Sequence, residues 1–354
     1  MGLADMPARP DIAAVADEHR FAQYVRTLGR GPGRSRALTR EEARDALGMV
    51  LAGEADPHQV GAFLMLLRYR GEDPDEMAGL VDAARAEMFG GVGAGLPEGC
   101  AGVDLDWPSY GAGRTRGEPW FLLAALALGR AGYRVLMHGS NEFSRGGSVG
   151  AGLAALGMRA AVDRADAGRL LDEGGFAYLP MGVVSPGMER LLRLRSVLGL
   201  RSPLNTAARL VNPFDARAGV DGVFHPAYIA LHLAAAERLG RERLVVVKGG
   251  GGEAERSPVK AVAAHWFGRG VGSGELGLAA VGVPDGAGGG RWRRLGLEGA
   301  GLGRLRLGLR SGWGCWRLGL RRRGWRRRRP GFGTGRLGMA GGGGVAALAA
   351  VAGG

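Results

Sequence analysis

Short apolar runs alternate with longer helix-like stretches between residues 102 and 247, and this alternation most constrains the fold. Continuous apolar runs of four or five residues are typical of strands that are buried on both faces. Their alternation with helices predicts an α/β domain with a mainly parallel sheet, in which ligands bind beyond the carboxyl ends of the strands. The expected strands lie at 102–105, 133–137, 176–179, 220–224 and 244–247, and the intervening helices at 120–130, 188–198 and 227–239.

The residues before this region predict a compact helical unit. Thr39 and Glu42 have the spacing of a capping box at a helix N-terminus. Asp56-Pro57 and Asp73-Pro74 repeat another start signal, in which an acidic N-cap is followed by proline at the first helical position. We therefore expect an N-terminal helical domain over residues 15–88, followed after a glycine-rich link by an α/β domain over residues 100–260.

The C-terminal segment 286–354 differs in composition from the rest of the chain. It holds fifteen arginines and one acid, Glu298, so its net charge is +14, whereas residues 1–285 carry −1. Such a composition without hydrophobic periodicity predicts disorder. Two explanations stay open: an evolved arginine-glycine segment that binds RNA or DNA, or a shifted reading frame in a gene rich in G and C, which would begin between residues 260 and 285.

Cysteine content and hydropathy indicate the compartment. Cys100 and Cys315 are the two cysteines, too few for a disulfide framework or a structural zinc site by themselves. The N-terminus lacks an apolar signal core, and no run of about 18 apolar residues could span a bilayer. We therefore expect a cytoplasmic protein with no membrane partner.

Several strand ends carry polar residues that could bind a ligand. Residues 138–141 could form a turn that cradles a phosphate, or a glycine-rich turn with a solvated histidine. Residues 248–255 could form a phosphate loop followed by magnesium-binding carboxylates, although a glycine run is more often a mobile loop. Asn205 and Asn212 could hold a ligand or satisfy backbone groups in a turn.

The order of these motifs resembles glycosyltransferase family 3, the family of anthranilate phosphoribosyltransferase. The resemblance covers roughly residues 18–258, and residues 186–213 line up without a gap. It implies an N-terminal helical domain that makes a homodimer and a larger α/β domain of the nucleoside phosphorylase/phosphoribosyltransferase type. It also implies an active site in the cleft between the two domains, where phosphoribosyl pyrophosphate and Mg²⁺ bind.

The resemblance assigns roles to individual residues. Arg195 matches an arginine that contacts the carboxylate of the aromatic acceptor, a role that suits a planar bidentate cation. His138, Gly139 and Asn205 match substrate-binding motifs of the family. Glu255 matches the second acid of the magnesium-binding pair, so Mg²⁺ is expected only if the chain is a transferase.

The sequence also departs from the family's motifs. The glycine-rich pyrophosphate loop is replaced by a segment that contains Trp107 and Pro108, and the first magnesium-binding acid is replaced by Ala254. A pyrophosphate requires close approach of backbone N–H groups, so Trp107-Pro108 is expected to obstruct it. The loss of one carboxylate is expected to weaken a magnesium site.

The replaced loop resembles a branch of the family that is regarded as DNA-binding rather than enzymatic. That resemblance implies phosphate contacts by Arg114, Arg116 and Lys248 and base stacking on Trp107 or Tyr110, without sequence preference. Core packing is the alternative role for Trp107, and also for Trp120. The sequence therefore predicts a nucleic-acid-binding protein with degenerate catalytic motifs. Its alternative is a transferase that moves phosphoribose from phosphoribosyl pyrophosphate to an aromatic amine.

Overall fold

A computed structural model of the chain describes residues 19–90, 100–111, 118–140, 147–257 and 260–280. The predictions for segment 286–354, and those for Arg114 and Arg116, lie outside the described residues. In the described part, no helix is long and apolar enough to cross a membrane.

The N-terminal domain begins with four helices: α1 (Ala22–Gly29), α2 (Arg40–Ala52), α3 (Pro57–Arg70) and α4 (Pro74–Phe89). The three predicted N-caps are confirmed, because Thr39, Asp56 and Asp73 each accept a backbone hydrogen bond in a complete capping box. Each cap satisfies N–H groups that the first turn of a helix leaves without partners.

The remaining elements build the α/β domain. The sheet consists of β1 (Leu105–Ser109), β2 (Val135–Gly139), β3 (Phe176–Pro180), β4 (Ala218–Val223), β5 (Arg243–Lys248), β6 (Val262–Gly268) and β7 (Gly272–Leu278). The helices are α5 (Trp120–Arg130), α6 (Val149–Ala155), α7 (Arg164–Gly174), α8 (Met181–Val184), α9 (Pro186–Arg193), α10 (Arg195–Leu198), α11 (Leu204–Leu210) and α12 (Tyr228–Arg238), with a single 3₁₀ turn, η1 (Gly250–Gly252).

The strand order in the sheet is β3-β2-β1-β4-β5-β6-β7. The first five strands are parallel, which confirms the predicted fold class of a helical domain followed by an α/β domain with a mainly parallel sheet. The chain leaves β1 toward β2 on one side and returns to pair with β4 on the other side. The position between β1 and β4 is therefore the topological switch point, where open α/β sheets bind ligands.

Several elements differ from the sequence prediction. The helix expected at 188–198 is divided into α9 and α10, and helices α6, α7 and α11 were not predicted. The first strand begins at Leu105 and continues through Asp106 and Pro108, past its predicted end, because β1 is the middle one of the five parallel strands and its Asp106 is paired in the interior. Strands β6 and β7 were not predicted, and they extend the sheet by an antiparallel hairpin over residues where a shifted frame was considered.

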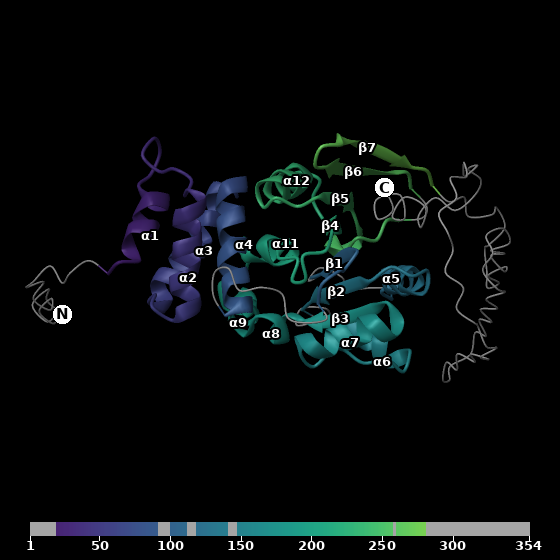
Figure 1. Cartoon of the computed structure of the whole chain (residues 1–354). Coiled ribbons are helices and arrows are strands. Elements are labelled where there is room, and N and C mark those ends of the chain that lie inside the picture. Colours follow the sequence, from purple (N-terminus) through teal and green to yellow (C-terminus); the bar gives the residue numbers. More distant parts are fainter. Residues whose placement is uncertain (1–18, 91–99, 112–117, 141–146, 258–259, 281–354) are drawn as a thin grey trace, which may run out of the picture.

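Helices cover both faces of the sheet (Figure 1). Helices α5 and α6 pack on the face that carries Trp107 and Met137, whereas α7 and α12 belong to the cluster that includes Leu136 and Val246 on the other face. Helix α4 lies between the N-terminal helices and the α/β domain and packs against α2, α11 and α12. The Arg85 guanidinium on α4 donates to the carbonyl oxygens of Val211 and Asn212, so polar contacts also join the two domains.

Candidate functional site

A chain of buried polar side chains crosses the carboxyl ends of β1 and β2. The Tyr110 hydroxyl lies 2.8 Å from Nδ1 of His138, and Nε2 of His138 lies 3.1 Å from Oδ1 of Asp106. The other carboxylate oxygen of Asp106 accepts a hydrogen bond of 2.7 Å from Arg241. All four side chains are buried, so this network fixes the position of His138 beneath the end of the sheet.

Burial and charge shift two of these groups in opposite directions. Burial raises the pKa of Asp106, but its interactions with His138 and Arg241 outweigh burial and hold that pKa below its ordinary value. Burial, with smaller effects of Tyr178 and Asp106, raises the pKa of Tyr110 well above 10. Asp106 is therefore a carboxylate and Tyr110 a neutral phenol at neutral pH.

Trp107 does not lie where the sequence analysis placed it. Its side chain is 1% exposed and stacks on Phe121 of α5, with ring centroids 6.4 Å apart. Successive side chains of a strand point to opposite faces, so Trp107 points away from the network of Asp106 and His138. The prediction that it obstructs a ligand at the end of β1 is wrong, and core packing is its role. Tyr110, which is 3% exposed, is likewise unable to stack on a base in this conformation.

Two arginines gather beside the switch point. Arg209 on α11 is 6% exposed, and its Cζ lies 5.8 Å from the centroid of the Tyr110 ring. A Cβ at Gly252, beyond the end of β5, would lie 3.5 Å from Nη2 of Arg209 and 3.5 Å from the backbone N of Phe224, beyond the end of β4. Arg209 therefore lies where the segments that follow β1, β4 and β5 converge. Arg201, half-buried, is close enough for its charge to interact with that of Arg209.

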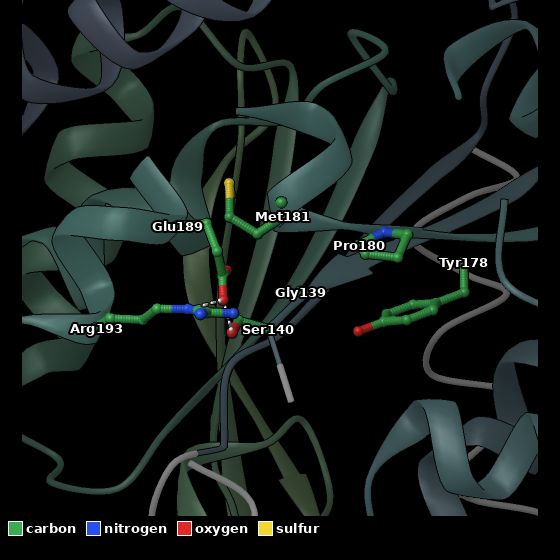
Figure 2. A pocket seen from close by; sticks show the side chains of 8 residues that line it. Gly139, Ser140, Tyr178, Pro180, Met181, Glu189 and Arg193 are labelled. Atoms are coloured by element: carbon green, nitrogen blue, oxygen red, sulfur yellow. Dashed lines mark hydrogen bonds and ion pairs between the residues drawn. The ribbon is translucent and has the colours of Figure 1, made fainter. Parts of the chain in front are cut away.

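A cavity of about 460 Å³ opens at the neighbouring ends of β2 and β3. Ser140 donates a 3.0 Å hydrogen bond to Oε1 of Glu189, and Nε of Arg193 lies 3.5 Å from the same oxygen. Oε2 of Glu189 is buried without a hydrogen-bond partner among the described residues. The hydroxyl end of Tyr178 points toward this group from the other side of the cavity (Figure 2). The lining residues are Gly139, Ser140, Tyr178, Pro180, Met181, Gly182, Glu189 and Arg193.

The predicted substrate-binding residues are dispersed around the cavity and around the pair Arg201 and Arg209. Gly139 lines the cavity, whereas the His138 side chain is fully buried and holds Tyr110 and Asp106. Arg195 begins α10 and lies half-buried near Arg201. Asn205 lies half-buried in α11, on the same helix as Arg209. Their roles toward a substrate stay predictions.

The residues predicted to bind metal or phosphate lie around the end of β5. Oε2 of Glu255 accepts a long hydrogen bond, 3.4 Å, from the backbone N of Phe121 at the start of α5. Lys248 is exposed at the end of β5. Asn212 satisfies the backbone of Ala216 through both atoms of its amide, which is the structural alternative considered for it. Nucleic-acid binding through Lys248 stays a prediction from the sequence.

Sequence reasoning missed Arg209, Arg201 and Glu189. Arg209 interrupts a short apolar run at the end of α11, since its neighbours Ala207, Ala208 and Leu210 are fully buried. A charged residue in such a run is almost never buried unless it meets a partner or a ligand, and this signal could have identified it. Glu189 carried no such signal, because its position on the cavity wall depends on how α9 packs.

Two protein-family models match this chain. The helical bundle domain of a glycosyl transferase family matches residues 22–88, and the α/β domain of the same family matches residues 121–266. Together the two matched ranges span more than half of the chain.

Similar proteins agree with this match. The anthranilate phosphoribosyltransferases of Rhizobium johnstonii and Rhizobium meliloti are each 33% identical to the chain over 214 and 215 residues. These alignments cover 60% and 61% of this chain, and the chain spans only 61% and 62% of the relatives' own length.

Solved structures show the same likeness. Anthranilate phosphoribosyltransferase from Thermus thermophilus is 30% identical, has a TM-score of 0.59, and is matched over 72% of each chain. The enzyme from Saccharomyces cerevisiae in complex with PRPP and Mg shares the fold with a TM-score of 0.58 over 73% of each chain, at 21% identity. None of these names describes a nucleic-acid-binding protein. With two domains of one family matched in order, the chain belongs to glycosyltransferase family 3, the family of the anthranilate phosphoribosyltransferases.

Proposed function

We propose that the chain is a phosphoribosyltransferase that moves phosphoribose from phosphoribosyl pyrophosphate to the nitrogen of an aromatic amine. The observation that carries this proposal is the pairing of two neighbouring features at one edge of the sheet. A cationic cluster of Arg201 and Arg209 lies beside the switch point, and a cavity lies at the ends of β2 and β3. The names of the relatives given above describe a transfer of the same kind.

The cavity suits an aromatic acceptor. Its volume of about 460 Å³ falls within the roughly 300–1,000 Å³ of ordinary ligand pockets, and Tyr178, Pro180 and Met181 give it an apolar wall. Glu189 and Arg193 give it a polar wall that can orient an amine and a carboxylate. The acceptor nitrogen would form a bond to the anomeric carbon of the donor while the bond from that carbon to the pyrophosphate oxygen breaks. The pyrophosphate would leave toward the cationic cluster, and the proton that the amine loses would pass to solvent.

The network of Tyr110, His138 and Asp106 would position both the cationic cluster, which would bind the donor, and the cavity, which would bind the acceptor. His138 precedes Gly139 and Ser140, which line the cavity, and Tyr110 lies against the guanidinium of Arg209. One buried hydrogen bond between Tyr110 and His138 therefore links the donor side to the acceptor side. Such fixed geometry contributes to catalysis by holding two reactants in an orientation that favours attack.

Magnesium does not fit the described residues as a resident ion. Mg²⁺ is usually bound by one or two carboxylates together with substrate phosphates. Here Ala254 stands beside Glu255, the Glu255 carboxylate is held at the start of α5, and no group of three metal-ligating side chains exists in the described part of the chain. Mg²⁺ therefore enters this proposal only as the counter-ion of the donor.

A pyrophosphate-release assay on the full chain tests the proposal. We expect release when phosphoribosyl pyrophosphate, Mg²⁺ and anthranilate are present together, and a background rate when the acceptor is omitted. A panel of other aromatic amines extends the assay. The cavity wall carries the negative charge of Glu189 as well as the positive charge of Arg193, so acceptors without a carboxylate are tested too. No release with any acceptor, together with no heat of donor binding in calorimetry, would refute the transferase.

A further inference from the structure

Two guanidinium groups beside the switch point have no anionic partner among the described residues. Arg209 is 6% exposed, and its Nη1 has no hydrogen-bond partner in the part of the chain that the structure describes. No ion pair of Arg201 or Arg209 with a carboxylate occurs within the described ranges, although other buried or half-buried arginines, such as Arg241 and Arg70, do form one. A buried charge without a partner is unfavourable, so this arrangement requires an explanation.

The local electrostatics show an excess of positive charge. Burial, followed by the charges of Arg209 and Arg195, lowers the pKa of Arg201 to about 10. The carboxylate of Glu253 opposes this effect, and Arg68 adds to it. The positive charges of Arg201, Arg209 and Arg195 therefore act on one another here, which favours binding of a multiply charged anion.

The backbone at this place allows a ligand to approach closely. Gly252 has a φ of 85°, a conformation that side chains rarely adopt, and it lies against both Nη2 of Arg209 and the backbone N of Phe224. At the end of β1 the corresponding space over Gly111 is filled by the carboxylate of Glu253, so the open approach to Arg209 is the one beside Gly252. The surroundings of Arg209 thus combine glycine backbone with guanidinium donors, which is the chemistry that recognises phosphate.

We propose that Arg201 and Arg209 form a pyrophosphate-binding site that does not require a divalent cation. The guanidinium groups supply the neutralisation that a carboxylate-bound Mg²⁺ would otherwise supply, in a chain that retains one carboxylate of a metal-binding pair. The identification of the anion as the donor's pyrophosphate rests on the proposed transferase function. The anion site itself rests on the geometry and charge of these two arginines.

Calorimetry on the full chain tests the site, with inorganic pyrophosphate as the probe and EDTA in the buffer. We expect saturable binding without Mg²⁺, and a loss of affinity of about tenfold or more in Arg209→Met and in Arg201→Gln, since a charge-assisted contact contributes about 1.4 kcal/mol or more. Arg44→Gln, which alters an exposed arginine on α2, is the matched control and should bind like the wild type. All these proteins keep segment 286–354, so any binding by its arginines cancels in the comparison.

Thermal unfolding separates a binding role from a structural one. Removal of an uncompensated buried charge should leave the melting temperature of ligand-free Arg209→Met equal to or above that of the wild type, while pyrophosphate no longer raises it. Lower stability of Arg209→Met combined with unchanged pyrophosphate affinity would assign Arg209 a structural role and overturn the proposal. If Arg209→Met does not fold, Arg201→Gln, at a half-buried position, decides the question by the same calorimetry.

The outcomes also separate this site from the proposed function. Pyrophosphate binding that requires Mg²⁺, or that is equal in all four proteins, would overturn the metal-independent site and leave the transferase standing. Metal-free binding that depends on Arg209, without pyrophosphate release in the presence of any acceptor, would remove the transferase and leave the anion site.

Discussion

The hydroxyl of Tyr110 lies 2.8 Å from Nδ1 of His138, and this contact joins the ends of the two strands that form the centre of the candidate site. Tyr110 directly follows β1, and His138 lies near the end of β2, opposite Pro108 in the register of the two strands. His138 is therefore held between Tyr110 and Asp106 rather than presented to solvent. His138 thereby positions the backbone of Gly139 and Ser140, which line the cavity.

Loss of this contact should destabilise the protein. Tyr110→Phe removes the hydroxyl and leaves Nδ1 of His138 buried without its partner, so we expect the free energy of unfolding to fall by about 1–3 kcal/mol. Urea denaturation followed by circular dichroism measures the change. Tyr69→Phe is the matched control, because the Tyr69 side chain is 90% exposed and its hydroxyl meets water. Equal stability of the two variants would show that the contact between Tyr110 and His138 does not stabilise the fold.

A second prediction concerns the close approach of β1 and β2. A Cβ on Gly139 would collide with the backbone carbonyl oxygen of Ser109, which a flexible side chain cannot relieve. Gly139→Ala should therefore destabilise the protein by about 1–3 kcal/mol or more, the range known for overpacking, or prevent soluble expression.

Gly48→Ala is the control for this substitution. Gly48 lies inside α2 with open space around its Cβ position, so the same change should stabilise the protein by roughly 0.5–1 kcal/mol. Melting temperatures of the two variants and the wild type provide the comparison. A Gly139→Ala protein as stable as the wild type would contradict the strand spacing.

Asp106 should make stability depend on pH in the acid range. Burial raises its pKa, but the interactions with His138 and Arg241 outweigh burial and hold the pKa below its ordinary value of 3.8. A carboxyl whose pKa is lowered by folding stabilises the protein above its unfolded-state pKa, and that contribution is lost as the pH falls below about 4. Asp106→Asn should cost about 3–5 kcal/mol at pH 7, since it leaves Arg241 buried without its partner.

The difference between wild type and Asp106→Asn should shrink as the pH is lowered from about 6 to about 3, across the ordinary range of a carboxyl pKa. Urea unfolding at each pH measures it. A constant difference would mean that Asp106 is not an ionised partner of His138 and Arg241 in the folded state.

The sequence was sufficient for the parts of the fold that local chemistry decides. The three helix caps at Thr39, Asp56 and Asp73 and the mainly parallel pairing of the strands were predictable from spacing and periodicity. The first strand was misplaced because Asp106 and Pro108 are unfavourable in isolated strands, and only tertiary pairing with His138 and Arg241 compensates.

The candidate site was harder to predict because it depends on which face of the sheet each side chain points to and on which strand ends lie side by side. Trp107 and Asp106 are neighbours in sequence but point to opposite faces, so one packs on α5 and the other holds His138. Arg209 and Gly252 are far apart in sequence and meet only because β1, β4 and β5 end at the same edge. No spacing rule connects such residues.

The charged wall of the cavity gives the last prediction, which rests on the proposed transferase. Glu189 and Arg193 lie together on α9 at one side of the cavity (Figure 2). For an acceptor that carries a carboxylate, such as anthranilate, the Glu189 charge is repulsive and the Arg193 charge attractive. Glu189→Gln should therefore lower the KM for anthranilate by about fivefold, since two charges about 4 Å apart interact by about 1 kcal/mol in water.

Arg193→Gln should raise that KM by a similar factor of about five for the same reason. Steady-state pyrophosphate release measures both variants, and Glu173→Gln, at an exposed position on α7, is the matched control for the change of net charge. The neutral acceptor aniline should show neither effect, because the argument depends on the carboxylate. Shifts of equal sign in Glu189→Gln and Arg193→Gln, or equal shifts with aniline, would place the acceptor's carboxylate elsewhere than against this wall.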